Sequence, residues 1–261
     1  PLPVLYEDRF GWSHRHVTAA TATERLLARA VGAEVPWLPP RRAVRSMVQS
    51  RHYRDALVAA GADPEEVVVR TLGIDGVAGA GRTGRPTRVG FVSTMFEEKG
   101  GSVVLAAFQK LLADRPDARL VVVGSGRRPT DSGLPEESVD WVGRVSRRQV
   151  LDELLPTIDV LVHPTRCDSG PPYVILEALQ RGIPVVTSDL AWIDEGLTGP
   201  AVRRVQPDPS PVSTALIDLF DPGTYAGASV AAVDLWRSRY SMDVLAELIG
   251  TTYREALAAR S

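Results

Sequence analysis

Short apolar runs alternate with segments of helical periodicity from Arg88 onward. A parallel sheet with helices on both faces gives this pattern, because strands buried on both sides are apolar throughout. The pattern therefore predicts an α/β unit built on one parallel sheet. The predicted strands are residues 89–93, 119–123, 139–142, 159–163, 184–188 and 201–205.

Helical spacing predicts the elements between these strands. In residues 102–112, Val104, Phe108 and Leu111 recur on one helical face, which indicates a core-facing helix. Ser146 is expected to cap a second helix, since its hydroxyl can accept a hydrogen bond from a free backbone amide. Residues 242–259 form an amphipathic tail and predict a closing helix.

A smaller set of elements precedes the sheet. Strands at 4–6, 44–48 and 67–70 and helices at 20–31 and 51–60 are too few for a complete doubly wound domain. We expect the rest to lie before Pro1 or on another chain. The predicted division is a partial N-terminal lobe (1–75), a glycine-rich linker (76–87), a sheet domain (88–241) and the closing helix (242–261).

Composition narrows the class of protein. The chain has 261 residues, 44% of them hydrophobic and 24% charged, and a formal net charge of −2, so it lacks the basic excess of a nucleic-acid-binding protein. Cys167 is the only cysteine, which excludes an intrachain disulfide and favours a cytoplasmic setting. The apolar runs are too short to span a bilayer, so we expect membrane contact to be peripheral at most.

Three stretches follow predicted strands and could carry chemistry. In the first, Lys99 and Gly100 stand between a strand and a helix, where free amides and the helix dipole bind anions. The alternative interpretation is a solvated turn with a mobile lysine.

The second stretch is Gly124-Ser125-Gly126. Pro129 occupies the place of the third glycine in a dinucleotide fingerprint, so NAD is disfavoured and no cofactor is expected. The stretch is better interpreted as a tight turn that lines the same cleft.

The third stretch runs from Asp168 through Tyr173 into a helix that carries Glu177. Glycine and proline open that helix, so its first amides can donate to a phosphate or a sugar hydroxyl. A carboxylate flanked by apolar residues needs a partner, and a ribose diol would serve as one. The alternative is a glutamate that compensates the helix dipole.

Taken in order, these stretches resemble the donor lobe of GT4-type retaining glycosyltransferases, which have the two-lobed GT-B fold. The segments that carry the resemblance are Glu98-Lys99-Gly100, Gly124-Ser125-Gly126, residues 139–145, residues 159–165, and Leu176-Glu177-Ala178 with residues 182–186. The resemblance implies an α/β, GT-B-type chain with a Rossmann-like sheet domain and a second, incomplete α/β domain.

The resemblance also implies roles for single residues. Lys99 would neutralise the donor diphosphate, Glu177 would hold the nucleotide ribose, and Asp168 would lie near the donor sugar. No metal is implied. The implied catalytic residues are Lys99, Asp168 and Glu177, and the implied donor-binding residues are Thr94, Gly100, Gly124, Gly143, Arg144, Val145, Ser169, Gly170, Pro171, Pro172 and Tyr173.

The chain departs from the family pattern in three places. Thr94 stands where an arginine is usual, and Ser169 stands where a first glutamate is usual, with Asp168 one residue out of register. His14 and His16 do not match the family's acceptor-lobe histidine.

The function implied is transfer of a sugar, with retention, from a nucleoside-diphosphate-sugar donor to a hydroxyl acceptor. A nucleotide-sugar epimerase or phosphorylase of the same architecture is an alternative, because fold alone does not fix chemistry. A non-catalytic nucleotide-sugar-binding partner subunit is another alternative, favoured by Thr94 and Ser169.

Overall fold

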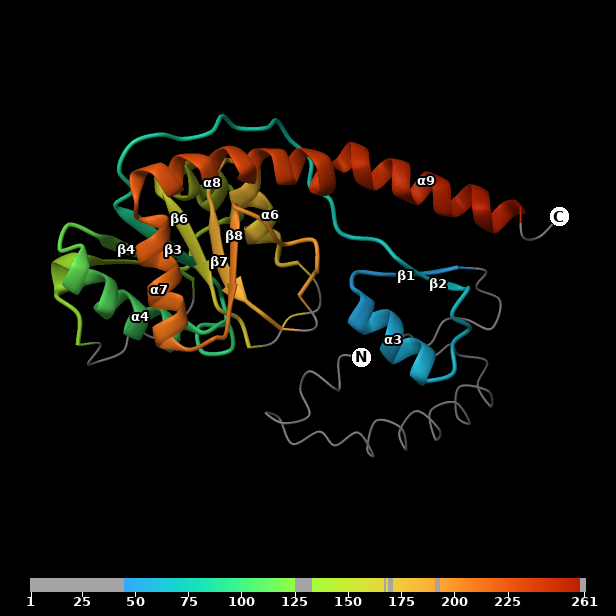
Figure 1. The fold of residues 1–261 in the computed structure, drawn as a ribbon, viewed down its shortest axis with the longest axis horizontal. Coiled ribbons are helices and arrows are strands. Elements are labelled where there is room, and N and C mark those ends of the chain that lie inside the picture. The colour runs from blue at the N-terminus through green and yellow to red at the C-terminus, as the bar shows by residue number, and fades with distance from the viewer. Residues whose placement is uncertain (1–44, 125–132, 167, 169–170, 191–192, 259–261) are drawn as a thin grey trace.

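The described part of the chain is built around a six-stranded parallel sheet (Figure 1). The structure is a computed structural model that describes residues 45–124, 133–166, 168, 171–190 and 193–258. All six predicted strands are confirmed to within a residue at each end. They are β3 (Arg88–Val92), β4 (Arg119–Val123), β5 (Val139–Gly143), β6 (Val160–His163), β7 (Val185–Ser188) and β8 (Val202–Val205).

The order of these strands is β5-β4-β3-β6-β7-β8. The chain moves outward from β3 to β5 on one side, then returns to place β6 on the other side of β3. This reversal is the switch point of a doubly wound sheet, and open α/β folds bind ligands outside the carboxyl ends of the strands at that point. The loops after β3 and β6 are therefore the first place to look for a site.

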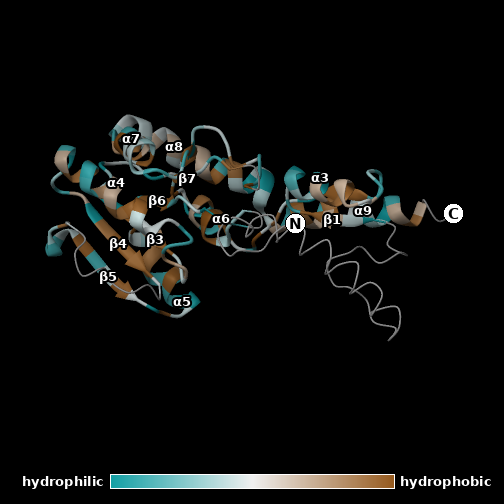
Figure 2. Ribbon diagram, turned by 90° about the horizontal axis from the view of Figure 1, so that it is seen from below, coloured by the Kyte–Doolittle hydropathy of each residue, from teal (hydrophilic) through white to brown (hydrophobic). Residues whose placement is uncertain are grey.

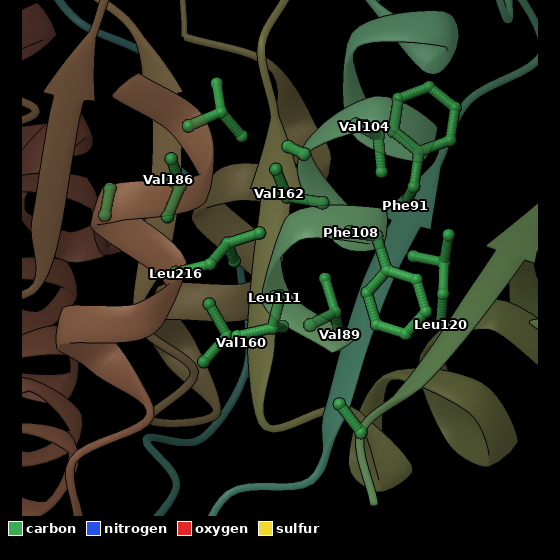
Figure 3. Packing of buried hydrophobic residues seen from close by; sticks show 14 of the residues in the cluster. Val89, Phe91, Val104, Phe108, Leu111, Leu120, Val160, Val162, Val186 and Leu216 are labelled. Atoms are coloured by element: carbon green, nitrogen blue, oxygen red, sulfur yellow. The ribbon is translucent and has the colours of Figure 1, made fainter. Parts of the chain in front are cut away.

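Helices cover both faces of the sheet. Val89 and Phe91 of β3 pack on Phe108 and Leu111 of α4 (Gly101–Asp114), which confirms the helix predicted over 102–112 (Figure 3). Residues of α7 (Pro209–Leu219) join the same cluster. The opposite face packs on α6 (Tyr173–Gln180), and α8 (Pro222–Leu235) contributes side chains to both clusters.

The helix predicted after Ser146 begins as expected but does not continue as one α-helix. Ser146 Oγ accepts a hydrogen bond from the Gln149 backbone amide, and Gln149 Oε1 accepts one from the Ser146 backbone amide. The two hydrogen bonds form a capping box. The segment then runs as α5 (Arg147–Gln149), the π-turn η2 (Val150–Leu154) and the 3-10 turn η3 (Leu155–Thr157). Pro156 has no amide to donate to the residue four positions earlier, so the α-helical ladder cannot pass through it.

The upstream elements form a separate small unit beside the sheet (Figure 1). Strands β1 (Ser46–Val48) and β2 (Val67–Val69) pair in parallel, and α3 (Arg51–Ala59) connects them. The predicted strand at 4–6, the predicted helix at 20–31, His14 and His16 lie outside the described residues.

The predicted closing helix is α9 (Met242–Ala258), which extends from the sheet unit to the upstream unit (Figure 1). Hydrophobic and hydrophilic residues alternate along it, as is typical of a helix that packs by one face (Figure 2). Arg70 Nε donates to Thr252 Oγ1 at 2.9 Å, so α9 is tied to the segment that follows β2. The boundaries between the four predicted segments stay a prediction.

Candidate functional site

Two loops meet at the switch point of the sheet. The turn before α4 and the segment after β6 are joined by a hydrogen bond of 3.1 Å from the Arg166 amide to the Glu98 carbonyl. Gly100 has a φ of 83°, and a Cβ there would lie 2.3 Å from the Pro164 carbonyl oxygen. Only glycine lets these two backbones approach so closely.

Lys99 and Asp168 form an ion pair across these two loops. Lys99 Nζ donates to Asp168 Oδ2 at 2.8 Å, and the two side chains are 16% and 15% exposed. Burial by itself raises the pKa of Asp168, but His163 and Lys99 together lower it below its ordinary value. Asp168 is therefore held as a carboxylate against the lysine.

His163 completes this cluster from the last position of β6. Its side chain is 4% exposed, and its Nε2 lies 3.7 Å from the same Asp168 Oδ2 that binds Lys99. The imidazole stacks on Phe91 at 6.4 Å between ring centroids. Burial lowers the pKa of His163 and outweighs the carboxylate of Asp168, which raises it, so the ring is neutral at pH 7.

Glu177 lies one turn inside α6 and is held by a different cation. Its side chain is 5% exposed and pairs with Arg147, which is 64% exposed. Burial raises the pKa of Glu177 and outweighs Arg147 and Arg181, which lower it. The Arg147 guanidinium also lies over the ring of Tyr173, 5.8 Å from its centroid.

A cleft of about 580 Å³ opens beside Glu177. Its walls come from α6, from the segment after Ser146 and from the chain that leads into the sheet unit. The lining residues are Gly73, Ile74, Asp75, Gly76, Val77, Gly79, Arg147, Leu151, Tyr173, Glu177, Gln180, Arg181 and Met242.

A smaller pocket of about 160 Å³ lies at the carboxyl ends of β3, β4 and β5. The Gly124 amide donates to the Gly143 carbonyl at 2.9 Å. Gly124 has a φ of 142°, and a Cβ there would lie 1.6 Å from the Ser93 carbonyl oxygen and 3.3 Å from the Thr94 nitrogen. The lining residues are Ser93, Phe96, Val122, Val123, Gly124, Trp141 and Gly143.

With this geometry in view, we compared the chain with known proteins. Residues 86–221 match the family model described as glycosyl transferases group 1. The chain belongs to this family. The glycogen synthase of Alkalilimnicola ehrlichii is 30% identical over 190 residues, which are 70% of this chain and 36% of that protein. The phosphatidyl-myo-inositol mannosyltransferase of Mycolicibacterium smegmatis is 28% identical over 168 residues, which are 62% and 43% of the two chains.

Solved structures confirm the GT-B-type fold of this family member. Sucrose-phosphate synthase from Thermosynechococcus elongatus superposes with a TM-score of 0.72 at 17% identity, covering 99% of this chain and 67% of that chain. HepE of Anabaena, solved in complex with UDP and glucose, superposes with a TM-score of 0.63 at 18% identity, covering 81% and 63%. Of the two curated relatives named above, the chain spans only 36% and 43% of the length.

The structure divides the sequence-predicted residues of this glycosyltransferase-family chain among three groups. Lys99, Gly100 and Asp168 meet at the switch point, whereas Glu177 and Tyr173 line the larger cleft. Gly124 and Gly143 line the smaller pocket, and the Thr94 backbone nitrogen would lie 3.3 Å from a Cβ on Gly124. Arg144 and Val145 continue the chain from Gly143. Pro171 is buried and Pro172 half-buried at the start of α6, whereas Ser169 and Gly170 lie outside the described residues.

Three contacts of the site were missed from the sequence. His163 stands at the carboxyl end of a strand, and Arg147 directly follows a helix N-cap. These positions in the sequence could have marked both residues as candidates for the site. Tyr53 reaches from α3 and donates to the Asp168 carbonyl at 3.1 Å. Nothing in the local sequence signals that contact, because the partners are separated by 115 positions.

Two further features are absent from the described positions. Among them, no three His, Cys, Asp or Glu side chains gather as the ligands of a metal ion. In the same part of the chain, none of the helices has both the length and the apolar character needed to cross a bilayer.

Proposed function

We propose that this chain is the donor-binding part of a retaining glycosyltransferase that transfers a sugar from a nucleoside-diphosphate-sugar to a hydroxyl acceptor. Membership of the group 1 family supports transfer of a sugar. Structural neighbours in complex with UDP and a sugar support a nucleotide-sugar donor. Because the chain spans only part of its relatives, the acceptor and the complete activity belong to this proposal.

The observation that carries the proposal is the position of Lys99. The lysine stands before the N-terminus of α4, at the switch point of a parallel sheet. The helix dipole and an ammonium group converge there on the place where open α/β folds bind anions. A diphosphate bound there, and later leaving, would have its charge stabilised by the ammonium group and the helix dipole.

Glu177 fits the ribose of the same donor. Its carboxylate is nearly buried beside a cleft of about 580 Å³, and its raised pKa shows that its protein partners do not fully replace water. Two ribose hydroxyls would donate to it and complete its hydrogen bonding. The base would then face the turn from Gly143 to Val145, and the sugar would face Asp168.

Calorimetry with UDP, GDP and ADP, with NAD as a control, tests the proposal directly. We expect one diphosphate to bind selectively, and Lys99→Ala to weaken that binding about ten-fold or more because a charge-assisted contact is lost. Lys110→Ala removes the same charge from the outer face of α4 and should leave the affinity unchanged. Glu177→Ala should also weaken binding.

Two results would contradict this assignment. A wild-type chain that binds none of the three nucleotides would remove the donor-binding function. Equal affinities for wild type, Lys99→Ala and Glu177→Ala would move the nucleotide to another site. Tight donor binding without turnover, in a protein with a complete first lobe, would instead support the non-catalytic partner subunit.

A further inference from the structure

The candidate diphosphate site already contains an anion. Asp168 Oδ2 lies 2.8 Å from Lys99 Nζ, and the two side chains are only 15% and 16% exposed. While this carboxylate remains beside the lysine, an approaching diphosphate adds a like-charge contact in a partly desolvated site. Such contacts are costly where water screens them weakly. Binding of a donor therefore requires the carboxylate to change its partner.

His163 is the group placed to receive that carboxylate. Its Nε2 lies 3.7 Å from Asp168 Oδ2, on a neutral ring that can donate from this nitrogen. A movement of roughly 0.7 Å would shorten 3.7 Å to the 3.0 Å of an ordinary hydrogen bond. In the described part of the chain, neither ring nitrogen of His163 has a hydrogen-bond partner at the present distances.

Hydrogen bonds anchor the described backbone near the exchange. The Asp168 carbonyl accepts from the Tyr53 hydroxyl at 3.1 Å, and the Arg166 amide donates to the Glu98 carbonyl at 3.1 Å. The His163 carbonyl accepts from the Thr187 hydroxyl at 3.1 Å. With these anchors, the carboxylate can change partner by turning its side chain.

His163 is a buried polar side chain beside an ion pair. A buried polar group without hydrogen bonds lowers stability, and such groups in native proteins call for an explanation. Phe91 already stacks on this ring, so an apolar side chain would suit the packing better. A role in holding the Asp168 carboxylate in one state of the site explains why a hydrogen-bond donor stands at position 163.

We propose that Asp168 is an internal counter-ion that the donor diphosphate displaces from Lys99, and that His163 is the positioning residue that holds the displaced carboxylate. This inference rests on the proposed function, since it needs a diphosphate at Lys99. It implies a second state of the site, in which Lys99 contacts the phosphate and Asp168 contacts His163.

Nucleotide affinities test both halves of the exchange. Using the diphosphate that binds wild type best, we expect Asp168→Asn to bind it about ten-fold more tightly, because a competing charge is gone. Asp140→Asn makes the same change at an exposed aspartate that pairs with Arg88, and its affinity should equal that of wild type.

The His163 half uses a double-mutant cycle. His163→Phe should weaken nucleotide binding about five-fold, since the displaced carboxylate loses its second partner, and His163→Gln should restore it because its amide can donate near the Nε2 position. In the Asp168→Asn background, His163→Phe should have no effect, because there is no carboxylate to hold. A packing role for His163 would weaken binding equally in both backgrounds.

Each outcome decides between the claims. Wild type that binds no diphosphate overturns the proposed function and this inference together. Wild type that binds, with Asp168→Asn equal or weaker, overturns the inference alone, as does an equal effect of His163→Phe in both backgrounds. If Asp168→Asn does not fold, nitrogen NMR of wild-type His163 serves instead: its Nε2 resonance must move when nucleotide is added, and an unmoved resonance overturns the exchange.

Discussion

Two ion pairs hold the carboxylates that are candidates for the donor site, and they are built differently. In the Lys99–Asp168 pair both partners are largely buried, and the pKa of Asp168 is lowered. In the Arg147–Glu177 pair the carboxylate is only 5% exposed, but the cation is 64% exposed and the pKa of Glu177 is raised.

The difference shows how well the protein compensates each carboxylate for its lost hydration. Asp168 has a buried cation and a histidine beside it, which more than offset its lost hydration. The guanidinium that covers Glu177 is screened by solvent and does not offset the hydration that Glu177 loses on burial. The first pair is therefore an electrostatically complete cluster that a ligand must open. The second is an incomplete one that a hydroxyl-bearing ligand would complete.

The largest effect is expected where the backbone holds the first pair together. Gly100→Ala should lower the free energy of unfolding by about 3 kcal/mol, from the left-handed backbone and from a Cβ placed 2.3 Å from the Pro164 carbonyl oxygen. Gly143→Ala is the matched control: its φ of 72° is similar, but its Cβ would meet nothing within 4 Å. It should cost only about 1 kcal/mol. Denaturant unfolding measures both, and equal losses would show that the close approach at Pro164 is unimportant.

Removing the cation from each pair should have a smaller and unequal effect. Lys99→Met leaves a largely buried carboxylate without its cation and should cost about 2 kcal/mol, between the values for exposed and fully buried pairs. Arg147→Met should cost less than about 1 kcal/mol, because an exposed guanidinium contributes little and Glu177 can take up a proton. Equal losses at pH 7 would remove the distinction between the two pairs.

Local patterns were sufficient to predict the sheet unit. Buried strands are apolar on both faces and the helices between them repeat at helical spacing, so the residues themselves carry the signal. The helix after Ser146 shows the limit. Its cap and its apolar spacing were correct, but the proline at position 156 broke the α-helical ladder into π and 3-10 turns.

The site was predictable in outline and not in its pairings. Segments that follow predicted strands singled out Lys99, Asp168 and Glu177. The structure pairs the first two and places Glu177 beside the larger cleft. Which cation meets which carboxylate depends on how loops pass each other in space. Asp168 is 69 positions from Lys99 and Glu177 is 30 from Arg147, so no local pattern could pair them.

The smallest expected effect is a difference in how the two clusters respond to acid. The pKa of His163 is lowered in the folded state, so its neutral form favours folding above about pH 6.5, and that contribution is lost as the pH falls below this value. The pKa of Glu177 is raised, so its contribution is fully present below about pH 4.5 and is lost as the pH rises through the folded value.

Between about pH 7.5 and pH 5 the two groups therefore act in opposite directions. His163→Phe should make the thermal midpoint less sensitive to acid than in wild type, because an acid-labile contribution is removed. Glu177→Gln should make it more sensitive, because a contribution that grows on acidification is removed. Midpoints measured across this range for the three proteins give the two slopes. Slopes that change in the same direction would show that the pKa values of His163 and Glu177 are not shifted in opposite directions in the folded state, and the contrast between the two clusters would then be wrong.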